Sequence, residues 1–393
     1  MAVTLRSLIK WSQKVENKTI SLKKMQIKNF LSLHQVSLPF KPLTVLVGAN
    51  ASGKTNILKT LLMLQRMMLR EKQPDSSTIQ SWTWAGDLRS KIDFKMQVET
   101  DNKRAIYHIV LQNKADKLIQ TEELLVNEVK VISVQQGFGE IRDEDDKNPI
   151  IYSSEKLALK SAGDYGNKPV THRLTNFIKN WAFFNFMPEV MRGKNVLLMN
   201  PSSDKPIQLD DEGTVLKHLL SVWHDDDYEK FELVSQSLAS VTDLNLARIN
   251  DGEGKLGLLE GYEKPIPLDS ASDGTLRLLA YYTLLNQTEL PSLIAIEEPE
   301  RNFHPAALIL VASLIEELAQ KTQVIVTTHS AQFLDAFDKD SLGDSLGVLL
   351  LQNHKGIGTS IIDFEDEQNR RGALSSWVKD FGIGSAIFDS ELL

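Results

Sequence analysis

The stretch LTVLVGANASGKTNILKTLLML, residues 43–64, decides the fold. Residues 43–47 are mostly apolar and rich in β-branched side chains, as in a buried strand, and residues 57–64 have the leucine content and spacing of a helix. Between them, GANASGKT fits the phosphate-loop pattern of glycine, four residues, glycine, lysine, and serine or threonine. A strand before the loop and a helix after it are the context that this pattern demands. The sequence therefore predicts an α/β nucleotide-binding fold.

Each residue type in the loop has a chemical reason. Gly48 and Gly53 let the backbone turn sharply, so that N–H groups meet phosphate oxygens at the positive end of the following helix. Lys54 can reach the β- and γ-phosphates, and the Thr55 hydroxyl can coordinate Mg²⁺. A turn that binds nothing would leave Lys54 and Thr55 unexplained. We therefore expect ATP and Mg²⁺ here, with the nucleotide held by Gly48, Asn50, Ala51, Ser52, Gly53, Lys54, Thr55 and Asn56.

Two adjacent glutamates follow a second apolar run in SLIAIEEPERNFHP, residues 292–305. We expect residues 293–296 to form a strand beside the phosphate-loop strand, which places Glu297 at the edge where doubly wound sheets hold their ligands. Glu297 then suits a water-mediated contact to magnesium, and Glu298 can act as general base on the attacking water. Two glutamates on an exposed loop are the structural alternative, but that reading does not explain why they follow a buried run.

A third apolar run, in TQVIVTTHS, ends at His329. A histidine in that place could hydrogen-bond the γ-phosphate or the attacking water. The alternative is a packed structural histidine. With the other two motifs present, the predicted catalytic residues are Glu298, His329 and Lys54.

The segment PLDSASDGTLRLLAYYTLL, residues 267–285, predicts a helix that begins near Thr275 behind the N-cap residues Ser270, Ser272 and Asp273. A well-capped helix is one reading. The other is a second anion site, because Ser272 and Gly274 stand at the positive end of that helix.

Taken together, GANASGKTN, SASDGTLRLL, IAIEEPERNFHP and VIVTTHS, in this order, resemble the ATPase head of the ABC superfamily. The resemblance is to the branch with RecF, the SMC proteins and the OLD-family ATPases, and within it to the short AAA-type ATPases of the AAA_21 group. ATPases of this group are often found in bacterial anti-phage defence and in mobile elements. It covers most of the chain from residue 25, and it is loose in the middle.

The resemblance implies a head-to-head homodimer, or a higher oligomer, with two ATPs at the interface. Ser272 and Gly274 would face the γ-phosphate of the partner, residues 301–304 would follow at the same interface, and hydrolysis would loosen the dimer. We expect this switch to control a separately encoded effector protein, or, in the alternative, to act on DNA in genome maintenance. A transporter subunit and a small-molecule kinase are less favoured classes, because EEPERNFHP is unlike the transporter sequence and a kinase would not need the signature serine.

Several residues depart from the pattern of these relatives. The first acidic residue after the strand is commonly aspartate and here is Glu297, and Asp273 stands where transporters place glycine. Leu31 replaces the basic residue that often follows NF. For the glutamine expected near magnesium, Gln80 and Gln97 are both weak candidates.

Four segments are expected: a basic N-terminal segment over 1–23, the first part of the nucleotide-binding lobe over 24–113, an inserted, mainly helical lobe with some strand over 114–267, and the signature helix with the second part of the nucleotide-binding lobe over 268–393. Residues 24–40 should give two strands and residues 92–111 an antiparallel hairpin. Sustained heptads are absent, so no long coiled coil is expected. The aromatic cluster NWAFFNFMPEV, residues 180–190, favours core packing over a partner surface.

Composition bounds the function classes. With no cysteine, the chain has no disulfides, thiolate zinc sites or cysteine nucleophiles. No run approaches the roughly 18 apolar residues of a membrane helix, so we expect a cytoplasmic protein without membrane contact. A net charge of −8 argues against coating of nucleic acid by bulk electrostatics. Residues 1–28 nevertheless hold seven basic residues and one acidic residue, as a solvated tail or as a phosphate-binding arm.

Overall fold

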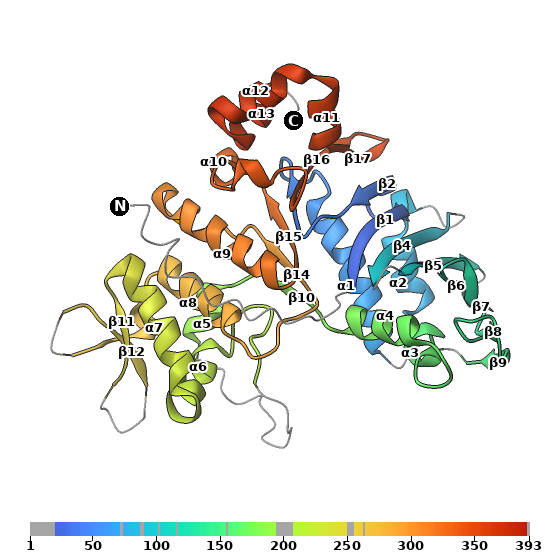
Figure 1. Ribbon diagram of the computed structural model, residues 1–393, viewed down its shortest axis with the longest axis horizontal. Coiled ribbons are helices and arrows are strands. Elements are labelled where there is room, and N and C mark those ends of the chain that lie inside the picture. The colour runs from blue at the N-terminus through green and yellow to red at the C-terminus, as the bar shows by residue number, and fades with distance from the viewer. Residues whose placement is uncertain are drawn as a thin grey trace.

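The computed structural model of the chain describes residues 20–70, 74–86, 90–100, 103–114, 117–154, 156–193, 207–249, 255–261 and 264–390. Of the expected basic segment 1–23, residues 1–19 lie outside these ranges. The described residues form an eight-stranded sheet, a six-stranded sheet and a small three-stranded sheet, with helices between and around them (Figure 1).

The six-stranded sheet carries the predicted nucleotide motifs. Its order is β10 (Trp181–Phe184), β14 (Leu293–Glu297), β15 (Gln323–Thr328), β3 (Leu43–Val47), β16 (Leu346–His354) and β17 (Gly358–Asp363). All neighbours pair in parallel except β16 and β17. Both faces of β3 are buried: Val45 and Val47 belong to one hydrophobic core and Leu46 to the other. Burial on both faces explains the continuous apolar runs in these strands.

One expected neighbour relation is wrong. The strand that ends in Glu297, β14, does not lie beside β3, because β15 pairs with both of them. The chain returns from β14 to β15 through helix α9 (Leu308–Lys321), and this crossover places β15 between β14 and β3. Strand order follows from such crossovers and not from the strand sequences, so a single apolar run does not reveal its neighbour. The carboxyl ends of all three strands still meet at one sheet edge.

The eight-stranded antiparallel sheet confirms the two strands expected over 24–40 and the hairpin over 92–111, in which Ile92 pairs with Leu111. Helix α1 (Lys54–Leu69) lies between this sheet and the six-stranded sheet. Its residues Ile57 and Leu61 share one core with Ile27 and with Ile325. The order of the sheet is β2 (Leu33–Pro39), β1 (Ser21–Phe30), β4 (Ile92–Thr100), β5 (Lys103–Lys114), β6 (Lys117–Val126), β7 (Val129–Gln135), β8 (Phe138–Ile141) and β9 (Ile150–Ser153).

The segment 114–267 differs from the mainly helical lobe that was expected. Residues 117–153 are strands that continue the eight-stranded sheet, because alternate residues such as Leu124 and Val126 are buried in strand fashion and β6 pairs along β5. Strand β10 belongs to the six-stranded sheet. Helices hold most of the rest: α3 (Leu159–Ala162), α4 (Pro169–Lys179), α5 (Pro188–Arg192), α6 (Leu216–Asp226) and α7 (Tyr228–Thr242).

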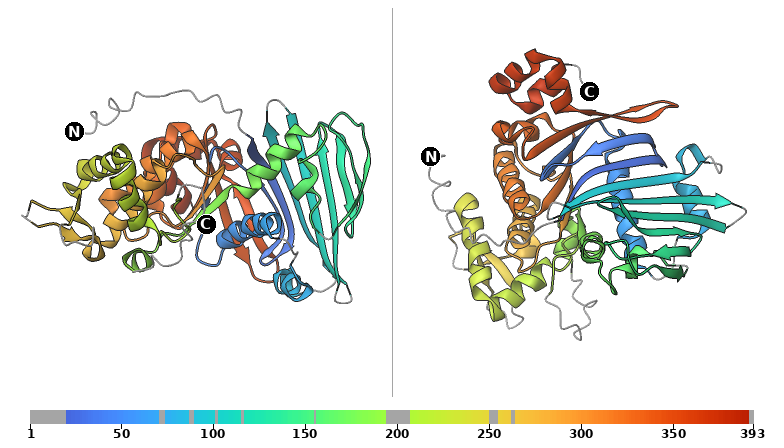
Figure 2. Two further views of the ribbon diagram at one scale, coloured as in Figure 1. Left: turned by 90° about the horizontal axis from the view of Figure 1, so that it is seen from below. Right: turned by 45° about the vertical axis from the view of Figure 1, so that its right-hand side comes forward.

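Helices α5, α6 and α7 form a lobe with α8 (Asp273–Leu285) and with the sheet of β11 (Asn245–Arg248), β12 (Leu256–Leu259) and β13 (Ile266–Pro267). Figure 2 shows this lobe and the eight-stranded sheet at opposite ends of the molecule. In the aromatic cluster, Trp181, Phe184 and Phe186 are buried, which confirms core packing.

The remaining helices cluster mainly at the C-terminal end of the chain (Figure 1). Within the described residues, no helix combines the length and apolar character that crossing a bilayer requires. The helices not yet named are α2 (Ser76–Trp82), α10 (Ala331–Asp335), α11 (Phe364–Arg370), α12 (Gly372–Phe381) and α13 (Ile383–Phe388). Single 3-10 turns lie at Trp84–Gly86, Leu268–Ser270, Pro305–Ala307 and Lys339–Ser341.

Candidate active site

The phosphate loop joins β3 to α1 and depends on both of its glycines. A Cβ atom on Gly48 would lie 2.4 Å from the carbonyl oxygen of Leu351. Gly53, the residue before α1, has a φ of 111°, and a Cβ atom there would lie 2.4 Å from Thr359 Oγ1. A side chain at either position would therefore clash or strain the backbone.

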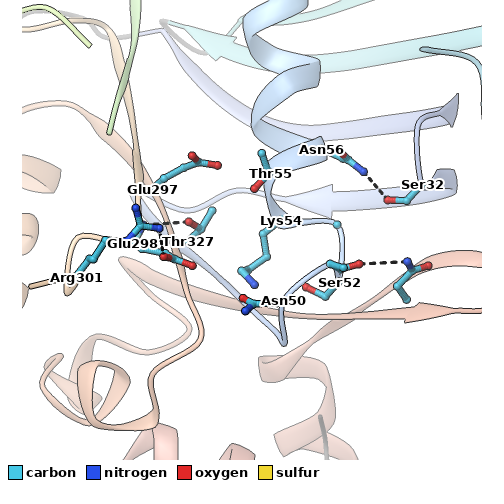
Figure 3. Close-up of a pocket in the computed structure, with 13 residues that line it drawn as sticks. Ser32, Asn50, Ser52, Lys54, Thr55, Asn56, Glu297, Glu298, Arg301 and Thr327 are labelled. Carbon is cyan, nitrogen blue, oxygen red and sulfur yellow. Dashed lines mark hydrogen bonds and ion pairs between the residues drawn. The ribbon is translucent and has the colours of Figure 1, made fainter. Parts of the chain in front are cut away.

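A cavity of about 380 Å³ opens in front of this loop (Figure 3). Lys54 and Thr55 face Glu297 and Glu298 across it, from elements nearly 250 residues apart in the chain. Gly48, which was expected to hold the nucleotide, does not line the cavity. The lining consists of Ser32, Asn50, Ala51, Ser52, Gly53, Lys54, Thr55, Asn56, Glu297, Glu298, Arg301, Thr327 and Asn353.

The loop has the groups that a phosphate chain requires. Lys54 Nζ donates to the carbonyl oxygens of Gly48 and Ala49, at 2.6 and 2.9 Å, which holds the ammonium group inside the loop. Burial lowers the pKa of Lys54, while the carboxylates of Glu298, Glu300 and Glu297 act in the opposite direction. The Ser52 hydroxyl is buried and has no hydrogen-bond partner among the described residues. An unpartnered donor beside a buried cation fits a bound anion.

The carboxylate of Glu298 is held by two side chains, Arg301 and His329. Its φ of 43° turns the chain sharply after β14, and its backbone N–H donates to Thr327 O at 3.1 Å. Its Oε1 lies 3.2 Å from His329 Nδ1, and its Oε2 accepts from Arg301. Burial opposes ionisation, yet the Arg301 guanidinium and His329 together hold the pKa of Glu298 below its usual range. The carboxyl is therefore ionised, as a general base must be.

Two further functional candidates lie in the EEPER segment: Glu300, which has no role in the sequence analysis, and Arg301, which is expected there only at the dimer interface. Arg301 lines the cavity with a side chain that is 51% exposed. Glu300 is buried, and the Thr328 hydroxyl donates to its Oε1. Its Oε2 is buried with no hydrogen-bond partner among the described residues, and burial raises the pKa of this carboxyl. The sequence signal for Glu300 is a third carboxylate two residues after the paired glutamates.

A smaller cavity of about 180 Å³ lies along α1 and shares Thr55 and Glu297 with the first. Asn185, directly after β10, lines it, and its Oδ1 is buried without a hydrogen-bond partner among the described residues. Neither Gln80, in α2, nor Gln97, in β4, lines either cavity. Asn185 is therefore an amide residue that shares a cavity with both predicted magnesium-binding residues, Thr55 and Glu297. A polar residue that ends an apolar run was again the signal.

The turn between β1 and β2 supplies Ser32 in place of the missing basic residue. Leu31 does not line either cavity. Ser32 Oγ lies 2.8 Å from Thr359 Oγ1 and accepts from Asn56 Nδ2 at 2.8 Å. Asn56 therefore anchors the loop to β1 and β2 through its side chain, while Asn353 Nδ2 donates to Ala51 O from β16.

The signature residues lie apart from this cavity within the chain. Ser272 is the exposed N-cap of α8, and its side chain accepts from the backbone N–H of Thr275 at 3.2 Å. A Cβ atom on Gly274 would meet its nearest neighbour, the carbonyl oxygen of Asn302, at an ordinary 3.4 Å. In contrast to Gly48 and Gly53, nothing in the described part of the chain requires glycine at position 274.

Comparison with known proteins agrees with this architecture. The family model AAA_21, described as "AAA domain, putative AbiEii toxin, Type IV TA system", matches residues 43–335. An OLD nuclease from Thermus scotoductus (strain ATCC 700910 / SA-01) is 50% identical over 40 residues, which are 10% of this chain and 8% of that protein. The match thus spans less than a tenth of the length of that curated relative.

Among solved structures, the chain resembles an SMC head bound to the C-winged helix domain of ScpA. The TM-score is 0.50 at 14% identity, over 88% of this chain and 99% of that one. The SMC head domain from Thermotoga maritima gives a TM-score of 0.45 at 12% identity, over 87% and 98% of the two chains. The likeness to the SMC head bound to ScpA, together with the phosphate loop that follows β3 in the six-stranded sheet, shows the fold of a P-loop ATPase head with a mixed sheet.

Proposed function

The chain belongs to the AAA_21 family, and from that premise we propose that it hydrolyses ATP to ADP and phosphate and works as a homodimer gated by ATP. The observation that carries the hydrolysis is the meeting of Lys54 and Thr55 with Glu297 and Glu298 in one cavity. A phosphate loop without an opposed carboxylate would bind a nucleotide and leave the attacking water without a base.

In the proposed reaction, a water oxygen attacks the γ-phosphorus, its proton passes to Glu298, and the bond to the bridging oxygen breaks so that ADP leaves. Lys54 and the N-terminal end of α1 stabilise the charge that develops on the phosphate oxygens. Thr55 and Glu297 would hold Mg²⁺, which neutralises charge on the β- and γ-phosphates when bound. His329 Nδ1, 3.2 Å from Glu298 Oε1, would orient the carboxylate.

The dimer is supported by the signature residues. Ser272 is exposed at the N-terminus of a 13-residue helix, away from the chain's own cavity. Gly274 is the second residue of α8, and a Cβ atom would fit there, so the described part of the fold gives no reason for glycine at this position. A glycine without an internal reason suits the close approach of an external group, and the nucleotide of a second copy is the group that the family resemblance implies. Loss of the γ-phosphate would then weaken the dimer and make the ATP state a switch.

We propose anti-phage defence as the setting, with a separately encoded effector under the control of the switch. Its support is indirect: the family description names a toxin of a type IV toxin–antitoxin system, and a short segment is similar to an OLD nuclease.

A direct action on DNA is the second candidate. Lys23, Lys24 and Lys28 are exposed on β1, and they belong to the basic segment noted in the sequence. DNA-stimulated ATPase activity that falls steeply with salt would favour this function, whereas activity insensitive to DNA favours the effector.

The test is complementation between two inactive variants. Lys54→Ala removes the phosphate contact, and Ser272→Arg blocks the surface offered to the partner, so each is expected to be inactive alone with ATP and Mg²⁺. Mixed together they can form a dimer with one intact composite site, which should recover up to about a quarter of wild-type activity by random pairing of protomers. Ser240→Arg, at an exposed position of α7, serves as the matched control and should stay active.

The outcomes separate the two parts of the proposal. Wild-type protein that does not hydrolyse ATP would overturn the enzymatic assignment. Active wild-type protein whose two variants fail both to complement each other and to form a mixed dimer in ATP would overturn the shared site and leave hydrolysis in place.

A further inference from the structure

Asp273, the residue that departs from the transporter pattern, uses both of its carboxylate oxygens. Oδ2 accepts from Asn302 Nδ2 at 2.8 Å. Oδ1 accepts from Arg192 Nη2, and the same guanidinium donates to Ala271 O at 2.8 Å. Asp273 is thereby fixed at the first position of α8, directly between Ser272 and Gly274. Glycine could make neither contact.

Asn302 belongs to the turn that carries the proposed general base. The turn covers residues 298–302, and its first and last residues, Glu298 and Asn302, have positive φ values of 43° and 67°. Backbone in this region costs energy for residues other than glycine and persists only where surrounding contacts hold it. The turn is closed by the N–H of Arg301 on Glu298 O at 3.0 Å, and the side chain of Arg301 reaches back to the Glu298 carboxylate.

Helix α8 holds the same turn at a second level. Arg277, one helical turn after Asp273, is only 2% exposed and donates from Nη1 to the carbonyl oxygen of Glu298 at 3.4 Å. The carbonyl oxygen of Asn302 also lies against Gly274. The signature end of α8 and the turn of Glu298 therefore move as one unit or distort each other.

We propose that Asp273 is a positioning residue that acts through Asn302 to set the turn of Glu298 and so couples the signature surface of a chain to hydrolysis in its own cavity. The inference rests on the proposed ATP hydrolysis and dimer. A nucleotide of the partner that contacts Ser272 and Gly274 displaces or fixes Asp273 between them, and the contact with Asn302 passes that change to Glu298. Occupancy of one site then changes the rate at the other.

A different role for Asp273 has to be separated from this one. A carboxylate in the first turn also stabilises a helix through its dipole and free N–H groups. That role requires a negative charge at position 273 and makes no demand on Asn302. The two roles can be distinguished by exchanging the side chains of Asp273 and Asn302.

The experiment compares Asn302→Asp, Asp273→Asn and the double exchange. Asn302→Asp sets two carboxylates against each other, and Asp273→Asn turns an amide toward Arg192. The double variant restores one hydrogen bond with donor and acceptor reversed, and aspartate tolerates the left-handed backbone of residue 302 as asparagine does. Each single variant should lower kcat at least about fivefold with KM for ATP within about twofold, a coupling of ordinary size, and the double variant should recover most of the loss.

Asn176→Asp, an exposed asparagine on α4, is the matched control and should leave kcat unchanged. Hydrogen exchange of residues 298–303 without nucleotide gives a readout independent of hydrolysis: it should rise in both single variants and return toward wild type in the double. If wild-type protein lacks ATPase activity, the proposed function fails, and the exchange data still test the link. Single variants with unchanged kcat, or a double variant as slow as the singles, would overturn the role of Asp273.

Discussion

His329 Nδ1 lies 3.2 Å from Oε1 of Glu298, and this contact joins the ends of two neighbouring parallel strands, β15 and β14. Arg301 occupies the other oxygen of the same carboxylate. Both partners are about half exposed, whereas the Glu298 side chain is 18% exposed. The carboxylate is thus the fixed centre of the group, and its two partners are the side chains with room to move toward a ligand.

Glu298→Gln should separate binding from hydrolysis. The amide keeps the size of the side chain but cannot accept a proton from water, so turnover should fall by roughly 10²- to 10⁴-fold while ATP still binds. The variant should therefore remain dimeric in ATP and Mg²⁺, as measured by size-exclusion chromatography with light scattering. Glu289→Gln, at an exposed position, is the control. A monomeric Glu298→Gln protein in saturating ATP would contradict the gated dimer.

Gly274→Ala should leave the folded chain intact and weaken its assembly. The new Cβ atom meets no atom of the chain closer than 3.4 Å, and alanine favours the helix by up to about 1 kcal/mol. The melting temperature should stay the same or rise, while the ATP-dependent dimer should dissociate about tenfold more readily, a change of about 1.4 kcal/mol. Gly372→Ala, also at the start of a helix with open space around it, should change neither property. Equal loss of stability and assembly would point to an internal role for Gly274.

Asn185→Ala should slow hydrolysis and raise the Mg²⁺ concentration required for it. The buried Oδ1 has no partner among the described residues, and Asn185 lines a cavity together with Thr55 and Glu297, so we expect its amide to contribute when magnesium is bound. A loss of about tenfold in kcat corresponds to about 1.4 kcal/mol. Titration of Mg²⁺ at fixed ATP is the measurement, with Asn176→Ala as control. Unchanged magnesium dependence would remove Asn185 from the site.

Glu122 should make stability depend on pH far from the active site. It is fully buried in β6, where it accepts from the backbone N–H groups of Ala158 and Leu159 at 2.7 and 2.8 Å and from Tyr107 Oη at 2.9 Å. Burial raises the pKa of Glu122 to about 7 despite these donors.

Because the pKa in the folded state lies above the ordinary value of 4.5, the folded chain binds the extra proton between these values. The contribution of Glu122 to stability is full below pH 4.5, falls as the pH rises and is lost above about pH 7, a change of about 3 kcal/mol. Denaturant unfolding of wild type and Glu122→Gln from pH 5 to 8 measures it. The unfolding free energy of wild type minus that of Glu122→Gln should fall as the pH rises, because only wild type loses a bound proton. A constant difference would be inconsistent with this titration.

The local parts of the site could be read from the sequence. Gly48, Gly53 and Lys54 serve within a single strand-turn-helix unit, so their spacing alone specifies the unit. The ends of β14 and β15 were found because both strands are buried on two faces and their apolar runs stop at polar residues. The same rule applied to the run WAFF would have pointed to Asn185. The aromatic residues of that run indicate core, however, and nothing in the sequence marks β10 as an edge strand of the same sheet.

Relations between distant segments could not be read in this way. The place of β15 between β3 and β14 follows from a crossover helix, and the strands of residues 117–153 were missed because their alternation is interrupted by polar loops. Glu122, Glu300 and Arg277 are charged residues whose burial depends on elements elsewhere in the chain.

The sequence by itself determined the nucleotide-binding unit and the kinds of group around it, because backbone turns and strand or helix periods depend on residues close together in the chain. Only the tertiary structure decided which groups share a cavity and which share a contact: Asn185 with Glu297, Ser32 with Asn56, and Asp273 with Asn302. Those pairings depend on strand order and helix packing, which satisfy the whole core at once, so no single segment contains the information that fixes them.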